Sequence, residues 1–312
     1  SLAGWALGQA GLKTKTRKGL AALILAANMP DTDVFLGRVP WEPLAMHRGF
    51  THGLAGISLM PPLLAGLLWL LDRWQVSRGA TIKSRLEMRW GWLVALCYFG
   101  AITHPLLDLL TTYSVQLLSP FSSAWYHADG LFIIDLWLCL LLGTAIFWSV
   151  RIEKKGGQWR RPAQAAIGIA CAYIGLNLLI TDRAVAAVRG WAGERQAEAI
   201  FASPQPIYFW RRQLVWREQD CYRRSAFDPL GKGFATVSAC QPTNLDDRRV
   251  LAAIRRAPAL RAFLRWSVLP VAEVEAGRCS TTVSIGDARY GESGARSRLR
   301  RQSVVPTGAA GC

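Results

Sequence analysis

Histidine and aspartate residues gather in the first half of this sequence at spacings that suit a divalent metal. All four histidines lie before residue 130, and each is close to an aspartate or to another histidine. His104 and Asp108 are four residues apart, so on a helix both side chains project from one face about one turn apart. Imidazole and carboxylate groups together suit Zn²⁺, with Mn²⁺ or Fe²⁺ as alternatives, better than Mg²⁺ or Ca²⁺.

Two further segments supply candidate ligands. Pro30-Asp31-Thr32-Asp33 places two carboxylates two residues apart, and a second segment runs from His47 to His52. The expected ligands are Asp31, Asp33, His47, His52, His104 and Asp108, with His127 and Asp129 as possible additions. Two simpler interpretations stay open: the aspartates near residue 31 cap a turn, or His104 and Asp108 form a buried polar pair that fastens two helices.

A metal in such a site lowers the pKa of a bound water to about 7 and polarises a phosphoryl or carbonyl oxygen. A carboxylate outside the ligand set can then orient or deprotonate that water. We assign this catalytic role to Asp33 or Asp135, and we expect Arg48 to contact the phosphate of a lipid headgroup.

Four apolar stretches are long enough to cross a bilayer, which takes roughly 20 residues per helix. They are Gly53 to Leu71, Gly91 to Leu110, Leu131 to Val150 and Ala163 to Thr181. Two earlier stretches, Leu2 to Leu12 and Gly19 to Met29, are too short to cross. The fold class is therefore mainly α: a polytopic membrane helix bundle of about four spans plus two short N-terminal helices, with a C-terminal α+β soluble domain.

The loops between these stretches differ in charge. The loop after the first stretch and the segment 151–162 are rich in Lys and Arg, whereas Thr111 to Gly130 contains neither. Basic loops stay in the cytoplasm. We therefore expect the candidate metal ligands and the C-terminal domain on the external, periplasmic side of a bacterial inner membrane.

The remainder of the chain is more polar and more basic. Residues 183–312 carry 21 Lys and Arg against 11 Asp and Glu, of a formal net charge of +16 for the whole chain. Basic residues beside apolar spans indicate contacts with membrane lipids rather than with nucleic acid. We expect a membrane-embedded metal-binding domain at 1–182, a soluble α+β domain at 183–290 with Ile207 to Arg217 as a strand, and a disordered tail at 291–312. The seven cysteines form no CxxC pair and predict no disulfide framework.

The motifs resemble those of the YdjM-like bacterial inner-membrane proteins, a family of membrane-bound metal-dependent hydrolases. The matching segments are Pro30 to Asp33, His47 to His52, His104 to Asp108 with Thr111 and Thr112, Leu117 to Phe121, and Phe132 to Asp135. The resemblance covers residues 1–182, and Val215 to Arg217 and Ile285 to Arg289 resemble an extension of longer members. The position of the family's first histidine would precede Ser1. The resemblance implies a hydrolase with a remote similarity to zinc-dependent phospholipase C and P1-nuclease enzymes.

These observations predict a membrane-bound metal-dependent hydrolase in which a metal-activated water attacks a phosphate ester or lipid-type ester at the membrane face. Two alternatives are a divalent-cation transporter and a non-catalytic membrane scaffold. Transport needs polar groups along the spans, yet the residues before His104, Trp92 to Phe99, are nearly all apolar. A scaffold would keep its function without its metal ligands.

Overall fold

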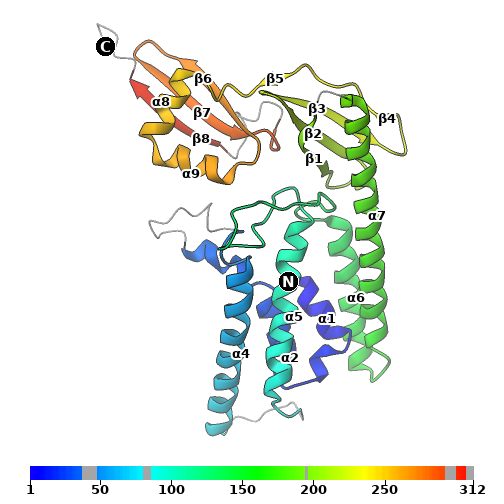
Figure 1. Ribbon diagram of the computed structural model, residues 1–312. Helices are drawn as coiled ribbons and strands as arrows, with labels where there is room; N and C mark the ends of the chain where they lie inside the picture. Colours follow the sequence, from blue (N-terminus) through cyan, green and yellow to red (C-terminus); the bar gives the residue numbers. More distant parts are fainter. Residues whose placement is uncertain (37–47, 80–85, 194–195, 292–299, 307–312) are drawn as a thin grey trace. The chain divides into compact units, whose positions relative to one another are not determined.

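The computed structural model describes residues 1–36, 48–79, 86–193, 196–291 and 300–306 (Figure 1). The chain divides into two compact units, unit 1 from Ser1 to Leu178 and unit 2 from Leu179 to Cys312. The division falls inside a long helix, a few residues before the expected boundary at 182. His47 lies outside the described residues, so its role as a ligand stays a prediction.

Four helices of the described chain are long and apolar enough to cross a membrane. They are α4 (Leu54–Ser77), α5 (Trp90–Leu109), α6 (Leu136–Lys154) and α7 (Arg160–Ala192). Large apolar side chains on α4, such as Leu63 and Leu67, are exposed, as a lipid-facing surface requires. The four expected spans are present, and α7 extends well beyond the apolar stretch that predicted it.

Two short helices, α1 (Leu2–Gln9) and α2 (Gly19–Ala26), lie among the long ones (Figure 1). A 3₁₀ turn, η1 (Leu12–Thr14), joins them, and a second one, η2 (Pro30–Leu36), follows α2. Eight residues span about 12 Å, well under the thickness of the bilayer core. Both short helices therefore lie inside the bundle without crossing it.

Small residues set how closely α2 approaches its neighbours. A Cβ atom at Gly100 of α5 would come within 2.6 Å of the carbonyl oxygen of Leu23 in α2, and a Cβ atom at Gly4 of α1 would meet the same oxygen. Only glycine allows two backbones to come this close. The packing of α2 against α5 matters for function because His104 lies one turn after Gly100.

The third span begins later than its hydrophobicity predicts. The stretch was expected to begin at Leu131 with Asp135 inside it, but α6 begins at Leu136 and Asp135 is its N-cap residue. The Asp135 carboxylate accepts a hydrogen bond from Leu138 N at 2.8 Å, which satisfies a backbone donor of the first turn. The prediction failed because an apolar sequence does not reveal which residue caps the helix.

Unit 2 combines two antiparallel sheets with helices. The first sheet contains β1 (Glu198–Pro204), β2 (Arg212–Glu218), β3 (Cys221–Asp228) and β4 (Gly233–Phe234) in that order, and β5 (Gln241–Pro242) pairs with β3. The second contains β6 (Pro270–Ala276), β7 (Ser280–Asp287) and β8 (Arg300–Pro306). Helices α8 (Arg248–Arg256) and α9 (Pro258–Trp266) pack on the second sheet (Figure 1). Unit 2 is thus an α+β module, as the sequence predicts.

Three expectations for unit 2 were wrong in detail. Residues 207–211 form a loop, because the strand expected from Ile207 begins at Arg212. The tail expected to be disordered includes β8, whose backbone pairs with β7 from Arg300 to Pro306. Cys221 and Cys240 form a disulfide with 5.6 Å between their Cα atoms, a pairing that their spacing alone did not predict.

Candidate metal centre

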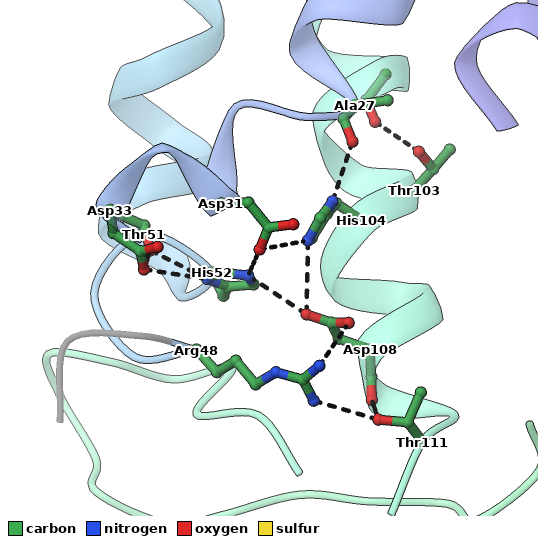
Figure 2. A network of polar contacts seen from close by, with 11 residues as sticks. Ala27, Asp31, Asp33, Arg48, Thr51, His52, Thr103, His104, Asp108 and Thr111 are labelled. Carbon is green, nitrogen blue, oxygen red and sulfur yellow. Dashed lines mark hydrogen bonds and ion pairs between the residues drawn. The ribbon is translucent and has the colours of Figure 1, made fainter. Parts of the chain in front are cut away.

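Two histidines and two aspartates meet at one end of the helices of unit 1. Asp31 belongs to η2, His52 to the turn before α4, and His104 and Asp108 to the last turns of α5. One ligand atom from each of Asp31, His52 and His104 lies within 4.8 Å of the others. Figure 2 shows the two imidazoles and the two carboxylates alternating around a common centre.

The separations between these groups are uniform. His52 Nε2 lies 3.4 Å from Asp31 Oδ1 and 3.3 Å from Asp108 Oδ2. His104 Nε2 lies 3.2 Å from the same oxygen of Asp31 and 3.6 Å from the same oxygen of Asp108. Each imidazole therefore faces both carboxylates.

These separations resemble those between neighbouring ligand atoms around a metal ion. For metal–ligand distances of about 2.0–2.2 Å, tetrahedral geometry places neighbouring ligand atoms about 3.3–3.6 Å apart. Direct hydrogen bonds between charged partners are shorter, at about 2.7–2.9 Å. The four imidazole–carboxylate separations of 3.2–3.6 Å match this spacing of neighbouring ligand atoms. Asp108 lies outside the group of three residues whose ligand atoms are all within 4.8 Å of one another. The donor set of two imidazole nitrogens and two carboxylate oxygens suits zinc in particular.

The packing of α2 against α5 orients His104. Its Nδ1 lies 3.0 Å from the carbonyl oxygen of Ala27, the C-cap residue of α2. Because a carbonyl only accepts, Nδ1 carries the proton and Nε2 presents its lone pair to the centre. A second partner of this kind is the usual support for a metal-bound histidine.

His52 is held through a hydroxyl and a carboxylate. Its Nδ1 lies 3.0 Å from Thr51 Oγ1, and that hydroxyl donates to Asp33 Oδ2 at 2.7 Å. The His52 side chain is fully buried and Asp33 nearly so. Asp33 therefore lies behind His52, 3.9 Å from Nδ1, on the side away from the centre. The sequence had suggested Asp33 as a ligand or base, whereas its position in the structure is that of a partner which orients His52.

Arg48 faces Asp108 from the other side. Its guanidinium lies 3.4 Å from Asp108 Oδ1, donates to Thr111 Oγ1 at 3.2 Å, and lies over the ring of Tyr113. The side chain is only 9% exposed, so its main partner is Asp108 rather than an open headgroup position. Arg48 leaves Oδ2 of Asp108 to face the imidazoles (Figure 2).

Carboxylates and imidazoles at the centre shift one another's pKa values. Burial raises the pKa of Asp31, but the neighbouring imidazoles of His104 and His52 lower it by more, so the carboxyl group stays ionised well below neutral pH. Burial lowers the pKa of His52, but Asp108 and Asp31 raise it above its ordinary value. Asp31 therefore supplies negative charge to the centre, and a metal ion that bound there would compete with a proton for the lone pair of His52.

The remaining predicted residues lie apart from this centre. His127 pairs with Asp129 at 3.0 Å in the loop after α5, and the metal-binding group in the described residues includes neither. Asp135 accepts a hydrogen bond from Tyr173 at 3.0 Å in addition to capping α6. No sequence pattern pointed to Tyr173, while Thr51 and Thr111 stood inside or beside the motifs without an assigned role.

A cavity of about 760 Å³ in unit 1 opens beside the centre. Asp31, Arg48, His104, Asp108 and Asp135 are among its polar lining residues, so Asp135, one of the two predicted catalytic residues, shares the cavity with the centre. Apolar side chains such as Leu131, Phe132, Ile134 and Leu138 line much of the rest. Ile134 on the apolar side is 72% exposed. Asp31 is the most exposed of the four donors, at 52%, so the centre is approached from its side.

Comparison with known proteins places the chain in a family. The YdjM inner membrane protein family matches residues 1–184. The chain belongs to this family. Family membership and the four apolar helices together make the chain a multi-pass inner-membrane protein. No curated protein matches the chain. No solved structure matches it either.

Proposed function

We propose that this YdjM-family protein is a metal-dependent hydrolase that cleaves a phosphate ester or lipid-type ester at the membrane face. The observation that carries the proposal is the group of Asp31, His52 and His104, whose ligand atoms lie within 4.8 Å of one another. Asp108 adds a carboxylate oxygen 3.3 Å from His52 and 3.6 Å from His104. A divalent ion there, with zinc as the best fit and manganese or iron as alternatives, supplies Lewis acidity and lowers the pKa of a bound water.

The residues around the centre have separate tasks in this mechanism. Asp31 is ionised and half exposed, so it would hold the metal from the side of the cavity, while Asp135, which lines the same cavity, would orient the water. Arg48 keeps Asp108 in place and offers positive charge to the cavity that both residues line. The chain of Asp33, Thr51 and His52 fixes the orientation of one imidazole.

The shape of the cavity supports an amphiphilic ester. Its polar part would receive the ester or phosphate group, while the apolar part formed by Phe132, Ile134 and Leu138 would receive a hydrocarbon chain. Because Ile134 is largely exposed in the turn just before α6, a helix long and apolar enough to cross a membrane, such a chain can enter from the lipid. Membrane lipids are thus the expected partners.

The interior of unit 1 argues against a cation pathway. The core between α2, α4 and α5 consists of apolar residues such as Leu23, Leu68, Leu93 and Leu96. A transported ion would need polar groups along this route. The donor atoms gather at one end of α5, which fits a site better than a passage.

Two observations support a periplasmic position for the site and for unit 2. A disulfide such as Cys221–Cys240 forms in an oxidising compartment, whereas the free cysteines in the described residues all lie in spans. At the opposite end of the bundle from the centre, the basic segment around Lys13 meets the basic end of α6, where Lys13 Nζ lies 2.5 Å from Glu153. A shared basic end of this kind marks the cytoplasmic side.

The test is an activity screen of the purified full chain after removal of metal and addition of Zn²⁺ or Mn²⁺. The substrates are phospholipids, lipid-linked pyrophosphates and a generic phosphodiester. Metal-dependent turnover that His104→Ala abolishes and His127→Ala retains would support the proposal. Full activity in His104→Ala, together with no stoichiometric metal by mass spectrometry, would rule it out. If deleting residues 200–312 removed the cellular phenotype while His104→Ala did nothing, the scaffold alternative would hold.

A further inference from the structure

The loop of residues 205–211, between β1 and β2, carries a run of large hydrophobic side chains. Ile207 is 56% exposed and Tyr208 is 46% exposed, and Phe209 and Trp210 are partly exposed beside them. The other exposed large hydrophobic residues in the described part of unit 2 are dispersed along the sequence, at Leu179, Leu230, Leu251 and Val304. The loop is therefore the place in this unit where exposed apolar surface is contiguous.

The side chains of this loop support one another. The ring of Trp210 lies edge-on to Tyr208, with 5.5 Å between ring centroids, and to Phe209, with 5.3 Å. The guanidinium of Arg211 lies 4.7 Å from the centre of the Tyr208 ring. The loop therefore presents an ordered aromatic surface with a cationic edge.

A buried arginine fixes this loop to α7. Arg212 is fully buried, donates from Nε to Thr181 Oγ1 at 2.9 Å, and donates from Nη1 to the carbonyl oxygen of Phe209. Thr181 is the last residue of the apolar stretch of α7, and Asp182 and Arg183 follow it. The loop is therefore attached to α7 where the apolar part of this span gives way to charge.

In a helix that crosses a membrane, the end of the apolar stretch lies near the headgroup region of the bilayer. Tyrosine and tryptophan concentrate there because each ring has an apolar body and a polar tip, and arginine pairs there with lipid phosphates. We propose that residues 206–211 insert into the headgroup region and anchor the first sheet of unit 2 to the membrane surface. This inference does not depend on hydrolase activity or on a metal.

The test measures the depth of this loop in a bilayer. In the full chain, Cys97, Cys139 and Cys171 are replaced by alanine, and a nitroxide label is attached at Ile207→Cys. The matched control is Leu230→Cys, at an exposed apolar residue (77%) between β3 and β4. Both proteins are placed in nanodiscs of phosphatidylethanolamine and phosphatidylglycerol. Collision rates with molecular oxygen and with a water-soluble nickel chelate are then recorded.

The expected result is a severalfold higher ratio of oxygen to chelate accessibility at position 207 than at position 230. Equal ratios would overturn the proposal, because they place the loop in water. Protection of position 207 from both reagents would overturn it too, because protein rather than lipid would then cover the loop. If Ile207→Cys does not fold, a label at Tyr208→Cys reports the same depth.

Discussion

Two buried polar clusters of unit 1 differ in how their charges meet. At the end with the basic segments, Arg17 Nη2 lies 2.6 Å from Asp72 Oδ2 and Lys18 Nζ donates to Gln75 at 2.5 Å. At the other end, the imidazoles of His52 and His104 stay 3.2–3.6 Å from two carboxylates. The first cluster joins opposite charges by direct contact, although Arg17 Nε and Asp72 Oδ1 are buried without a hydrogen-bond partner among the described residues. The second cluster keeps its imidazole nitrogens and carboxylate oxygens far enough apart for a small cation to lie between them.

Buried charge has two distinct uses in this membrane protein. A direct pair such as Arg17–Asp72 holds helices together, and removing one member leaves the other uncompensated. A ring of spaced donors is held by outer partners such as Ala27 and Thr51 rather than by its own contacts. The two clusters should therefore respond differently to substitution.

The largest expected effect is the loss of metal in His104→Ala. Removing one of four donors should weaken metal affinity by more than the roughly 100-fold that loss of an outer partner costs. Zinc content after dialysis, measured by mass spectrometry, checks this. His127→Ala is the matched control, because His127 pairs with Asp129 outside the centre and its removal should leave the zinc content unchanged. If His104→Ala retained its zinc, the cluster of His52 and His104 would not be a metal site and would not differ in role from the Arg17–Asp72 pair.

Asp72→Ala should lower the free energy of unfolding by about 3–5 kcal/mol, because it leaves Arg17 without its partner. Denaturation of the detergent-solubilised chain measures this loss. The zinc content should not change, since the pair lies at the opposite end of the bundle. Glu87→Ala breaks the exposed contact with Arg89 and should cost at most about 1 kcal/mol. A loss of zinc in Asp72→Ala would contradict the view that this pair stabilises the fold and takes no part in metal binding.

Thr51→Val should weaken zinc affinity by about 10- to 100-fold without abolishing binding, because it removes the hydroxyl between Asp33 and His52. Competition with a chromophoric chelator measures the change. Thr103→Val is the control, since the Thr103 hydroxyl donates only to Gly100 O of its own helix, at 2.6 Å. Equal affinities for the two variants would show that Asp33 does not act through Thr51.

A direct pair in unit 2 makes the stability of the chain depend on pH. Asp287 is fully buried, and Arg289 contacts both its oxygens at 2.9 Å. Burial raises the pKa of Asp287, but the guanidinium of Arg289 lowers it by more, to below its ordinary value. This pair therefore contributes stability above the unfolded carboxyl pKa of about 3.9, and the contribution is lost as pH falls through the lower folded value.

Near-ultraviolet circular dichroism during acid titration of the full chain checks this prediction. Asp287→Asn, which cannot ionise, should be less stable than the parent at pH 7, and the difference should shrink in acid. A constant difference between pH 7 and pH 2 would show that the charge of Asp287 does not matter.

Much of the fold follows from the sequence because hydrophobicity and spacing are local properties. Runs of about 20 apolar residues determined the four spans, and the four-residue spacing determined that His104 and Asp108 share a helical face. The Pro-Asp-Thr-Asp and His-Arg-Gly-Phe-Thr-His segments identified Asp31 and His52 as candidates. These features need only the geometry of a helix and the thickness of a bilayer.

Tertiary structure decided how the candidates divide into roles. The close approach at Gly100 brings Ala27 to His104, and the turn before α4 places Thr51 between His52 and Asp33. Asp33 and Asp31 are two residues apart, and yet one lies behind an imidazole and the other faces the centre. Which way each carboxylate points depends on contacts between segments far apart in the chain, and residue type and spacing do not contain that information.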